Sequence, residues 1–317
     1  MIECYKTGPS GTVLIDTPEA GCWVNVVMPT VAERTWLLND LGIVPEFVAS
    51  AFDVEETSHI DYDDDTGQVL VIVDYPAVED ASEAEDPSII QYDTQPFSLL
   101  LLPEKNVIVT VAMFPCETVT AFAKGKIRQF DTRMRTRFLL QALLHIAQRY
   151  QACLTNVSRQ FIKTEKALRK SMRNEHLIKM LGFEKSLLYF STSLRADQAT
   201  LTKIRMGRII KLYEEDQELL DDVFIEVQQA TEMCSIYSSI LTRTMETFGS
   251  VISNNLNSVM RTLTIITVVL AMPTIVFSFY GMNVDLPLDN TWLLPAAFSI
   301  ALAALVAVLL SRGKFFR

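Results

Sequence analysis

A short tripeptide, Gly281-Met282-Asn283, lies between two long uncharged segments near the carboxyl end of this 317-residue chain. The segments run over residues 262–284 and 290–311, and each exceeds the roughly 20 residues that a helix needs to cross a bilayer. Only Asp285 and Asp289 carry charge between them, so we expect two membrane spans joined by a tight hairpin. A glycine followed by a methionine and a carboxamide at the mouth of such a hairpin indicates the entrance of a pore.

Small or hydrogen-bonding side chains recur in steps of three and four along the first span. They are Asn257, Met260, Thr264, Thr267, Ala271, Thr274 and Ser278. One interpretation is a helix–helix contact, because Ser, Thr and Ala mediate close packing in membranes. The other is a pore lined by hydroxyl and backbone groups that tolerate a hydrated cation, with Leu263 or Met260 as an apolar ring that closes it. Two spans cannot enclose a pore, so the second interpretation requires a symmetric oligomer.

The elements that must position these residues begin with an α/β region. Prolines occur up to Pro115 and then not again until Pro273. Before Pro115, apolar runs rich in β-branched residues predict strands at 12–16, 23–28, 69–75, 97–102 and 107–112. The last two flank the turn 103–106 and predict a hairpin. Thr30 and Glu33 have capping-box spacing, and Pro45 suits the first turn of a further helix.

From about Asp131 the pattern is helical. A last helix is predicted from near Glu214 to Tyr280, which makes it about 65 residues and roughly 100 Å long. Its apolar residues alternate steps of three and four, typical of a helix packed in a bundle. The seam is Leu220, Val223, Val227, Ala230, Cys234, Tyr237, Leu241, Thr244, Phe248 and Val251.

Charge and composition exclude several functions. The net charge is −10, and the basic residues at 163–173 are interspersed with acids, so nucleic acid is not an expected partner. Three acidic runs, at 53–65, 79–86 and 214–222, are first explained as solvated surface. The chain contains no GxSxG, HExxH or P-loop sequence, so we do not expect an enzyme or an ATP-driven pump.

Basic residues predict the orientation of the spans. Arg261 precedes the first span, and Arg312, Lys314 and Arg317 follow the second, whereas the connecting loop has none. We therefore expect both termini in the cytoplasm and the loop outside, in a protein of the cell (inner or plasma) membrane. Five scattered cysteines without a pairing pattern agree with a reducing compartment.

The run from Asn257 to Thr264, followed by Tyr280-Gly281-Met282-Asn283, resembles the CorA magnesium transporter family. Two terminal spans, a basic tail and a long preceding helix extend the resemblance over nearly the whole chain. It implies a funnel-shaped homopentamer, in which the first spans line the pore and the second form an outer ring. It also implies that Tyr280, Gly281, Met282 and Asn283 form a selectivity entrance for hydrated Mg²⁺, with Co²⁺ or Ni²⁺ as surrogates and no organic cofactor. Mg²⁺ sheds water reluctantly, which suits an outer-shell carboxamide.

The family's pattern is not matched everywhere. Ala271 lies where many members have a bulkier Met, and Pro273 is shifted by one place, which favours Leu263 and Met260 as the gate. The resemblance further implies a regulatory Mg²⁺ site between subunits, with Asp222 as its stalk carboxylate and Glu246 as a second acidic position. Glu79 or Asp80, after the strand at 69–75, is the expected partner in the amino-terminal domain. A bound cation would relieve repulsion of about 4 kcal/mol per close carboxylate pair and hold the pore closed.

The predicted architecture is thus an α/β cytoplasmic domain (1–130), a helical region and stalk (131–256) and a transmembrane hairpin with a basic tail (257–317). The predicted function is passive influx of divalent cations, gated by cytoplasmic Mg²⁺. The partners are the bilayer, divalent cations and further copies of the chain. Two alternatives remain: a zinc or cobalt transporter of the same superfamily, and a membrane-anchored cytosolic sensor.

Overall fold

The computed structural model describes residues 1–9, 11–79, 91–207, 209–282 and 293–312. By internal contacts the chain separates into two compact units, Met1–Thr242 and Arg243–Arg317. The first contains a sheet and the helices that cover it; the second contains the end of helix α6 (Glu214–Tyr280) and helix α7 (Leu293–Arg312). The three-part division after residues 130 and 256 stays a prediction.

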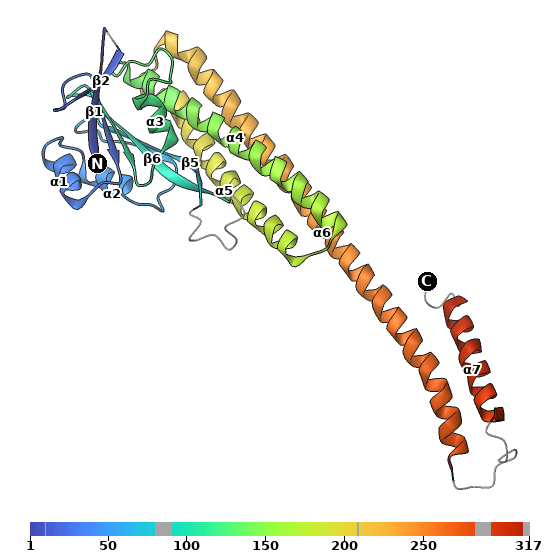
Figure 1. The fold of residues 1–317 in the computed structure, drawn as a ribbon. Helices are drawn as coiled ribbons and strands as arrows, with labels where there is room; N and C mark the ends of the chain where they lie inside the picture. The colour runs from blue at the N-terminus through green and yellow to red at the C-terminus, as the bar shows by residue number, and fades with distance from the viewer. Residues whose placement is uncertain (10, 80–90, 208, 283–292, 313–317) are drawn as a thin grey trace. The chain divides into compact units, whose positions relative to one another are not determined.

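One mixed sheet forms the centre of the first unit (Figure 1). Within the described residues it has seven strands in the order β2-β1-β3-β7-β6-β5-β4. Only β3 and β7 pair in parallel; all other neighbours are antiparallel. The strands are β1 (Ile2–Gly8), β2 (Gly11–Ile15), β3 (Cys22–Val27), β4 (His59–Tyr62), β5 (Val69–Val78), β6 (Tyr92–Leu102) and β7 (Val107–Ala112).

Five of these strands lie at the predicted apolar runs. The sequence pattern missed β1 and β4, which lie toward the two edges of the sheet and mix polar with apolar residues. The predicted hairpin is confirmed by the antiparallel β6–β7 pair, whose register brings Leu102 opposite Val107. Asn106 closes the turn with a left-handed φ of 53°, a conformation that Asn tolerates better than most residues.

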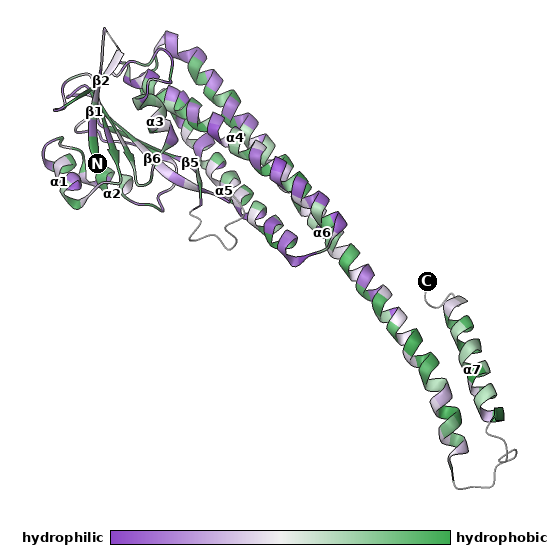
Figure 2. Ribbon diagram, in the orientation of Figure 1, coloured by the Kyte–Doolittle hydropathy of each residue, from purple (hydrophilic) through white to green (hydrophobic). Residues whose placement is uncertain are grey.

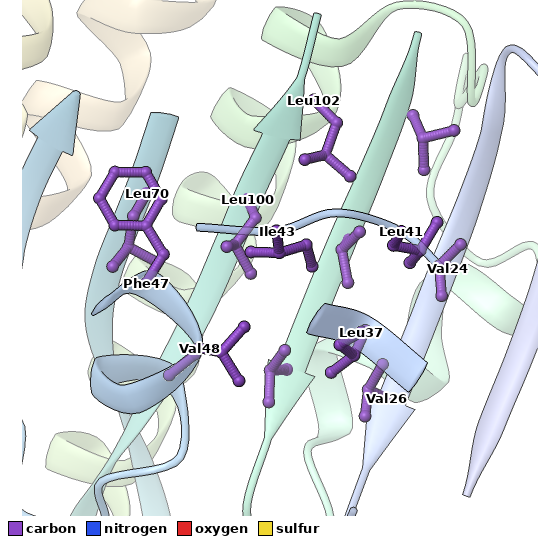
Figure 3. Close-up of a cluster of buried hydrophobic side chains, with 14 of the residues drawn as sticks. Val24, Val26, Leu37, Leu41, Ile43, Phe47, Val48, Leu70, Leu100 and Leu102 are labelled. Carbon is purple, nitrogen blue, oxygen red and sulfur yellow. The ribbon is translucent and has the colours of Figure 1, made fainter. Parts of the chain in front are cut away.

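Two short helices, α1 (Val31–Asn39) and α2 (Pro45–Ala51), cover one face of the sheet. Thr30 and Glu33 form the predicted capping box, and Pro45 occupies the first turn of α2. Leu37, with other apolar side chains of this segment, packs onto strand residues in a continuous cluster (Figure 3). The strand residues include Val24, Val26, Leu70, Leu100 and Leu102.

The opposite face carries α3 (Glu117–Ala123), α4 (Arg135–Lys170) and α5 (Asn174–Arg205), of which α4 and α5 contact each other and β5. Trp23 is fully buried there, and its Nε1–H donates to the Thr110 hydroxyl at 2.8 Å. Rings from a strand, a loop and two helices surround it: Tyr5, Phe122, Phe130 and Phe138. This aromatic cluster fastens the helical layer to the sheet.

Helix α6 runs without interruption for 67 residues, as the sequence predicted. The seam positions from Leu220 to Cys234 are buried in the first unit, which confirms the three-four pattern there. Toward its carboxyl end α6 becomes apolar, and α7 is apolar along its 20 residues (Figure 2). Both helices are long and apolar enough to cross a membrane.

Candidate functional site

The predicted pore residues occupy one face of α6 in the second unit. At 3.6 residues per turn, all eight positions from Asn257 to Ser278, Leu263 included, fall within an arc of about 120°. Seven of the eight side chains are exposed, and Ala271 is half-buried. The structure therefore gathers the predicted set on one helix surface.

A different face of the same segment is the less exposed one. Ile265, Val268 and Met272 are half-buried and Val276 is only 6% exposed, and none belongs to the stripe. Away from the stripe, the partial burial thus falls mainly on apolar residues. The exposed polar stripe is left open to another copy of the chain, to lipid or to an ion and its water.

Three threonines of the stripe have hydroxyls in a common arrangement. The Oγ1–H groups of Thr264, Thr267 and Thr274 donate to the carbonyl oxygens four residues earlier, at 2.8, 2.8 and 3.3 Å. A hydroxyl has one donor and two acceptor positions, so these bonds use the donor and leave lone pairs directed away from the helix. A hydrated cation turns the hydrogens of its water outward, and an acceptor-rich surface is therefore suited to it.

The tripeptide begins where α6 ends. The Gly281 N–H donates to the Phe277 carbonyl at 2.9 Å, and the Met282 N–H to that of Phe279 at 3.4 Å. A Cβ on Gly281 would lie 3.2 Å from the Phe277 oxygen, a tight contact with an atom of the backbone. The helix end therefore favours glycine on steric grounds. Tyr280 is half-buried and Met282 exposed, whereas Asn283 lies outside the described residues.

The two predicted regulatory carboxylates on α6 are both exposed. Asp222 and Glu246 are separated by 24 residues of one helix, more than six turns, so they do not belong to the same ion site. Among the described residues, no three His, Cys, Asp or Glu side chains are grouped so that one chain could hold a metal ion. Within the described residues, neither position has the neighbouring ligands to hold a divalent ion in one chain.

Glu79, the predicted partner, already has a cation. Its Oε1 lies 2.8 Å from the Nζ of Lys185 on α5, and its side chain is only 12% exposed. This hydrogen bond raises the pKa of Lys185 and keeps it charged. No local pattern predicts this pair, because Lys185 is 106 residues away along the chain. Asp80, the other predicted partner, lies outside the described residues.

The chain combines an α/β domain with the long helix α6, which is apolar near its carboxyl end, and with a second apolar helix, α7. This combination is that of a membrane protein with two spans near its carboxyl end. A family described as "CorA-like Mg2+ transporter protein" matches residues 18–312. The chain belongs to this family, as the resemblance of its motifs indicated. The family is one of transporters, not of enzymes.

Known proteins agree with this assignment. The cobalt/magnesium transport protein CorA of Methanocaldococcus jannaschii is 25% identical over 305 residues, which cover 93% of this chain and 89% of the relative. The complete structure of the CorA magnesium transporter from the same organism superimposes with a TM-score of 0.79 at 21% identity, covering 98% of this chain and 96% of that one. The full-length CmaX protein gives a TM-score of 0.71 at 13% identity, covering 98% and 97%. These structures confirm the predicted fold of the chain.

Proposed function

We propose that this protein is a passive Mg²⁺ channel of the cell membrane that also accepts Co²⁺ and Ni²⁺. The observation that carries the proposal is the hydroxyl-bearing stripe on α6. Its threonine donors are used internally, its acceptors face away from the helix, and it ends one turn before the tripeptide. In a stretch otherwise rich in Ile, Val and Leu, such acceptors suit an ion that keeps its water.

The proposal requires several copies of the chain, because one stripe forms only one wall. We infer a homopentamer in which five copies of α6 surround the pore and five copies of Asn283 form its entrance. Met260 and Leu263, which are 52% and 55% exposed, are the apolar side chains on the stripe and would close the pore by excluding water. The basic residues flanking the spans support cytoplasmic termini.

Regulation by cytoplasmic Mg²⁺ is the finer part of the proposal. Asp222 is exposed on α6 and is therefore accessible to a neighbouring chain. Glu246 would form a separate contact further along α6. Glu79 is a weaker ligand because Lys185 neutralises it, and Asp80 keeps its predicted role as an alternative.

Ion uptake into proteoliposomes tests the channel function. We expect Mg²⁺ to enter vesicles that contain the wild-type protein, and Asn283→Ala to abolish this uptake. Asn290→Ala, a carboxamide removed from the same connecting segment, is the matched control and should transport normally. Uptake of Zn²⁺ without Mg²⁺ would favour the zinc transporter. If the wild-type protein transports none of Mg²⁺, Co²⁺, Ni²⁺ and Zn²⁺, the result would favour the membrane-anchored sensor.

A further inference from the structure

Two carboxyl groups approach each other in the first unit, and neither belongs to the residues assigned above. Asp74 lies on β5 and Asp197 on α5, which is packed against that strand. Asp197 Oδ1 accepts hydrogen bonds from the Ser58 hydroxyl at 2.7 Å and from the backbone N–H of Asp74 at 3.0 Å. The Asp197 side chain thus ties α5 to β5 and to the segment that precedes β4.

The sheet explains why an acceptor is needed at this position. Strand β4 begins at His59, which pairs with Ile72, so β5 continues past the start of its neighbour. The N–H of Asp74, two residues further on, therefore has no strand partner on that side. Ser58 Oγ, at 3.1 Å, and Asp197 supply acceptors in place of a strand. This requirement fixes Asp197 next to the carboxyl group of Asp74.

Neither carboxyl group forms an ion pair with a basic side chain in the part of the chain that the structure describes; the basic side chains of Lys185 and Arg149 act on Asp93 and Cys153. The polar and titratable groups near the pair are Asp93 and Thr94 on β6, Tyr150 and Cys153 on α4, Ser193 on α5, and Ser58. The side chains that α6 contributes, Val223 and Val227, are apolar. Asp197 is only 7% exposed. Asp74 is half-buried. Two carboxylates that lack full hydration and are not paired with a cation would repel each other, which is costly for both.

The buried hydroxyl of Tyr150 is a second sign that the hydrogen bonding around the two carboxyl groups is incomplete. Tyr150 is fully buried, and its hydroxyl makes no hydrogen bond of ordinary geometry within the described part of the chain. The Tyr150 hydroxyl lies close enough to Asp74, Asp197 and Ser193 to interact electrostatically with all three. A buried hydroxyl without a partner is unusual in a native interior.

The available space decides what neutralises the pair. A void of about 10 Å³ touches Tyr150 and Asp197 and is otherwise lined by apolar side chains. That is at most the room needed by a single water molecule, so a hydrated Mg²⁺ ion does not fit. A proton needs no such room. Burial, and after it the charge of Asp74, raises the pKa of Asp197 well above its ordinary value, and burial raises the pKa of Asp74 as well.

We propose that the Asp74–Asp197 pair carries one proton at neutral pH and forms a proton-sensitive joint between β5 and α5. Below the ordinary pKa range of an aspartate, the folded and unfolded chains are both protonated and the stability contribution of the joint is complete. As the pH rises through the raised pKa of the folded pair, the proton leaves and that stability is lost. The joint therefore loosens in alkali, whether or not the protein conducts Mg²⁺.

Infrared spectroscopy of the full chain in detergent tests the proton directly. At pH 7 we expect the C=O band of a protonated carboxyl group, which disappears when the pH is raised. Asp197→Asn should reduce the intensity of this band while keeping an oxygen to accept from Ser58 and from Asp74 N–H. Asp221→Asn, which changes an exposed α6 side chain that is 59% accessible, is the control and should keep the band.

Thermal unfolding gives a second readout. The unfolding midpoint of the wild type should fall more steeply between neutral and alkaline pH than that of Asp197→Asn. Should Asp197→Asn fail to fold, Asp74→Asn and the pH titration of the wild-type band answer the same question. A wild-type spectrum without a protonated carboxyl band at pH 7, or a band of unchanged intensity in both variants, would overturn the proposal.

Discussion

Replacing Thr267 by valine tests whether the polar stripe of α6 faces an ion. Valine has nearly the volume of threonine, so the change removes a hydroxyl and leaves the shape of the helix surface. The Thr267 hydroxyl donates to the Leu263 carbonyl at 2.8 Å and is exposed on the stripe. The substitution would remove one outward-facing hydrogen-bond acceptor, the Thr267 hydroxyl oxygen, from the pore for every copy of the chain.

The magnitude follows from the number of acceptors that touch the ion's water. A net hydrogen bond contributes about 1 kcal/mol. If two of the five hydroxyls in a pentamer contact the hydration shell at once, their loss raises the barrier by about 2 kcal/mol. That corresponds to uptake slower by roughly 30-fold, since each 1.36 kcal/mol is a factor of ten.

The structure offers a matched control one and a half turns away. Thr262 is also exposed, and its hydroxyl donates to the Ser258 carbonyl at 3.0 Å in the same arrangement. Because it lies about 140° around the helix from Thr267, Thr262→Val removes the same chemical group from a different face.

Initial rates of Mg²⁺ uptake should be measured in proteoliposomes with equal amounts of each variant. We expect Thr267→Val to be slow and Thr262→Val to resemble the wild type. Equal slowing in both variants would mean that the hydroxyls support the helix and not the ion. A normal rate in Thr267→Val would remove the stripe from the ion path.

Two further predictions concern the first unit. Phe138→Ala should lower its stability by about 4 kcal/mol, because a fully buried ring against Trp23 is lost; the check is chemical unfolding followed by tryptophan fluorescence and circular dichroism, and a loss below about 1 kcal/mol would contradict the packing argument. Asp222→Ala should abolish the protection that Mg²⁺ gives the full chain against limited proteolysis, because a carboxylate of the proposed intersubunit site is removed. Unchanged protection would exclude Asp222 as a ligand, and Asp221→Ala on the same helix is its control.

Local patterns in the sequence determined much of the molecule. Five strands, the β6–β7 hairpin, the capping box of Thr30 and the uninterrupted α6 depend on residues that are neighbours along the chain. Their signals are periodicity and turn chemistry, and these survive in a single sequence. The stripe from Asn257 to Ser278 was predictable for the same reason, because one helix face is a matter of spacing alone.

Other features required the tertiary structure. The sheet order could not be read from the sequence. Its single parallel pair, β3 with β7, joins segments about 85 residues apart, and their apolar runs do not indicate which strands will pair. Strand β4 was missed because its four residues, of which only Ile60 is buried, contain no apolar run. The ion pair of Glu79 with Lys185 depends on how α5 lies against β5, and no local pattern records that contact.

The carboxyl pair illustrates the difference most clearly. Asp74 appears in the sequence as a polar residue inside an apolar strand, and Asp197 as an ordinary charge on a helix. Only the packing of α5 on β5 brings them together, burying Asp197 and half-burying Asp74, and this burial raises the pKa of both carboxyl groups. The sequence by itself determined the helices, most strands and the face of α6 that bears the hydroxyls, because hydrogen bonding and amphipathic spacing act over a few residues. The tertiary structure decided which distant charges meet, because that depends on contacts between elements.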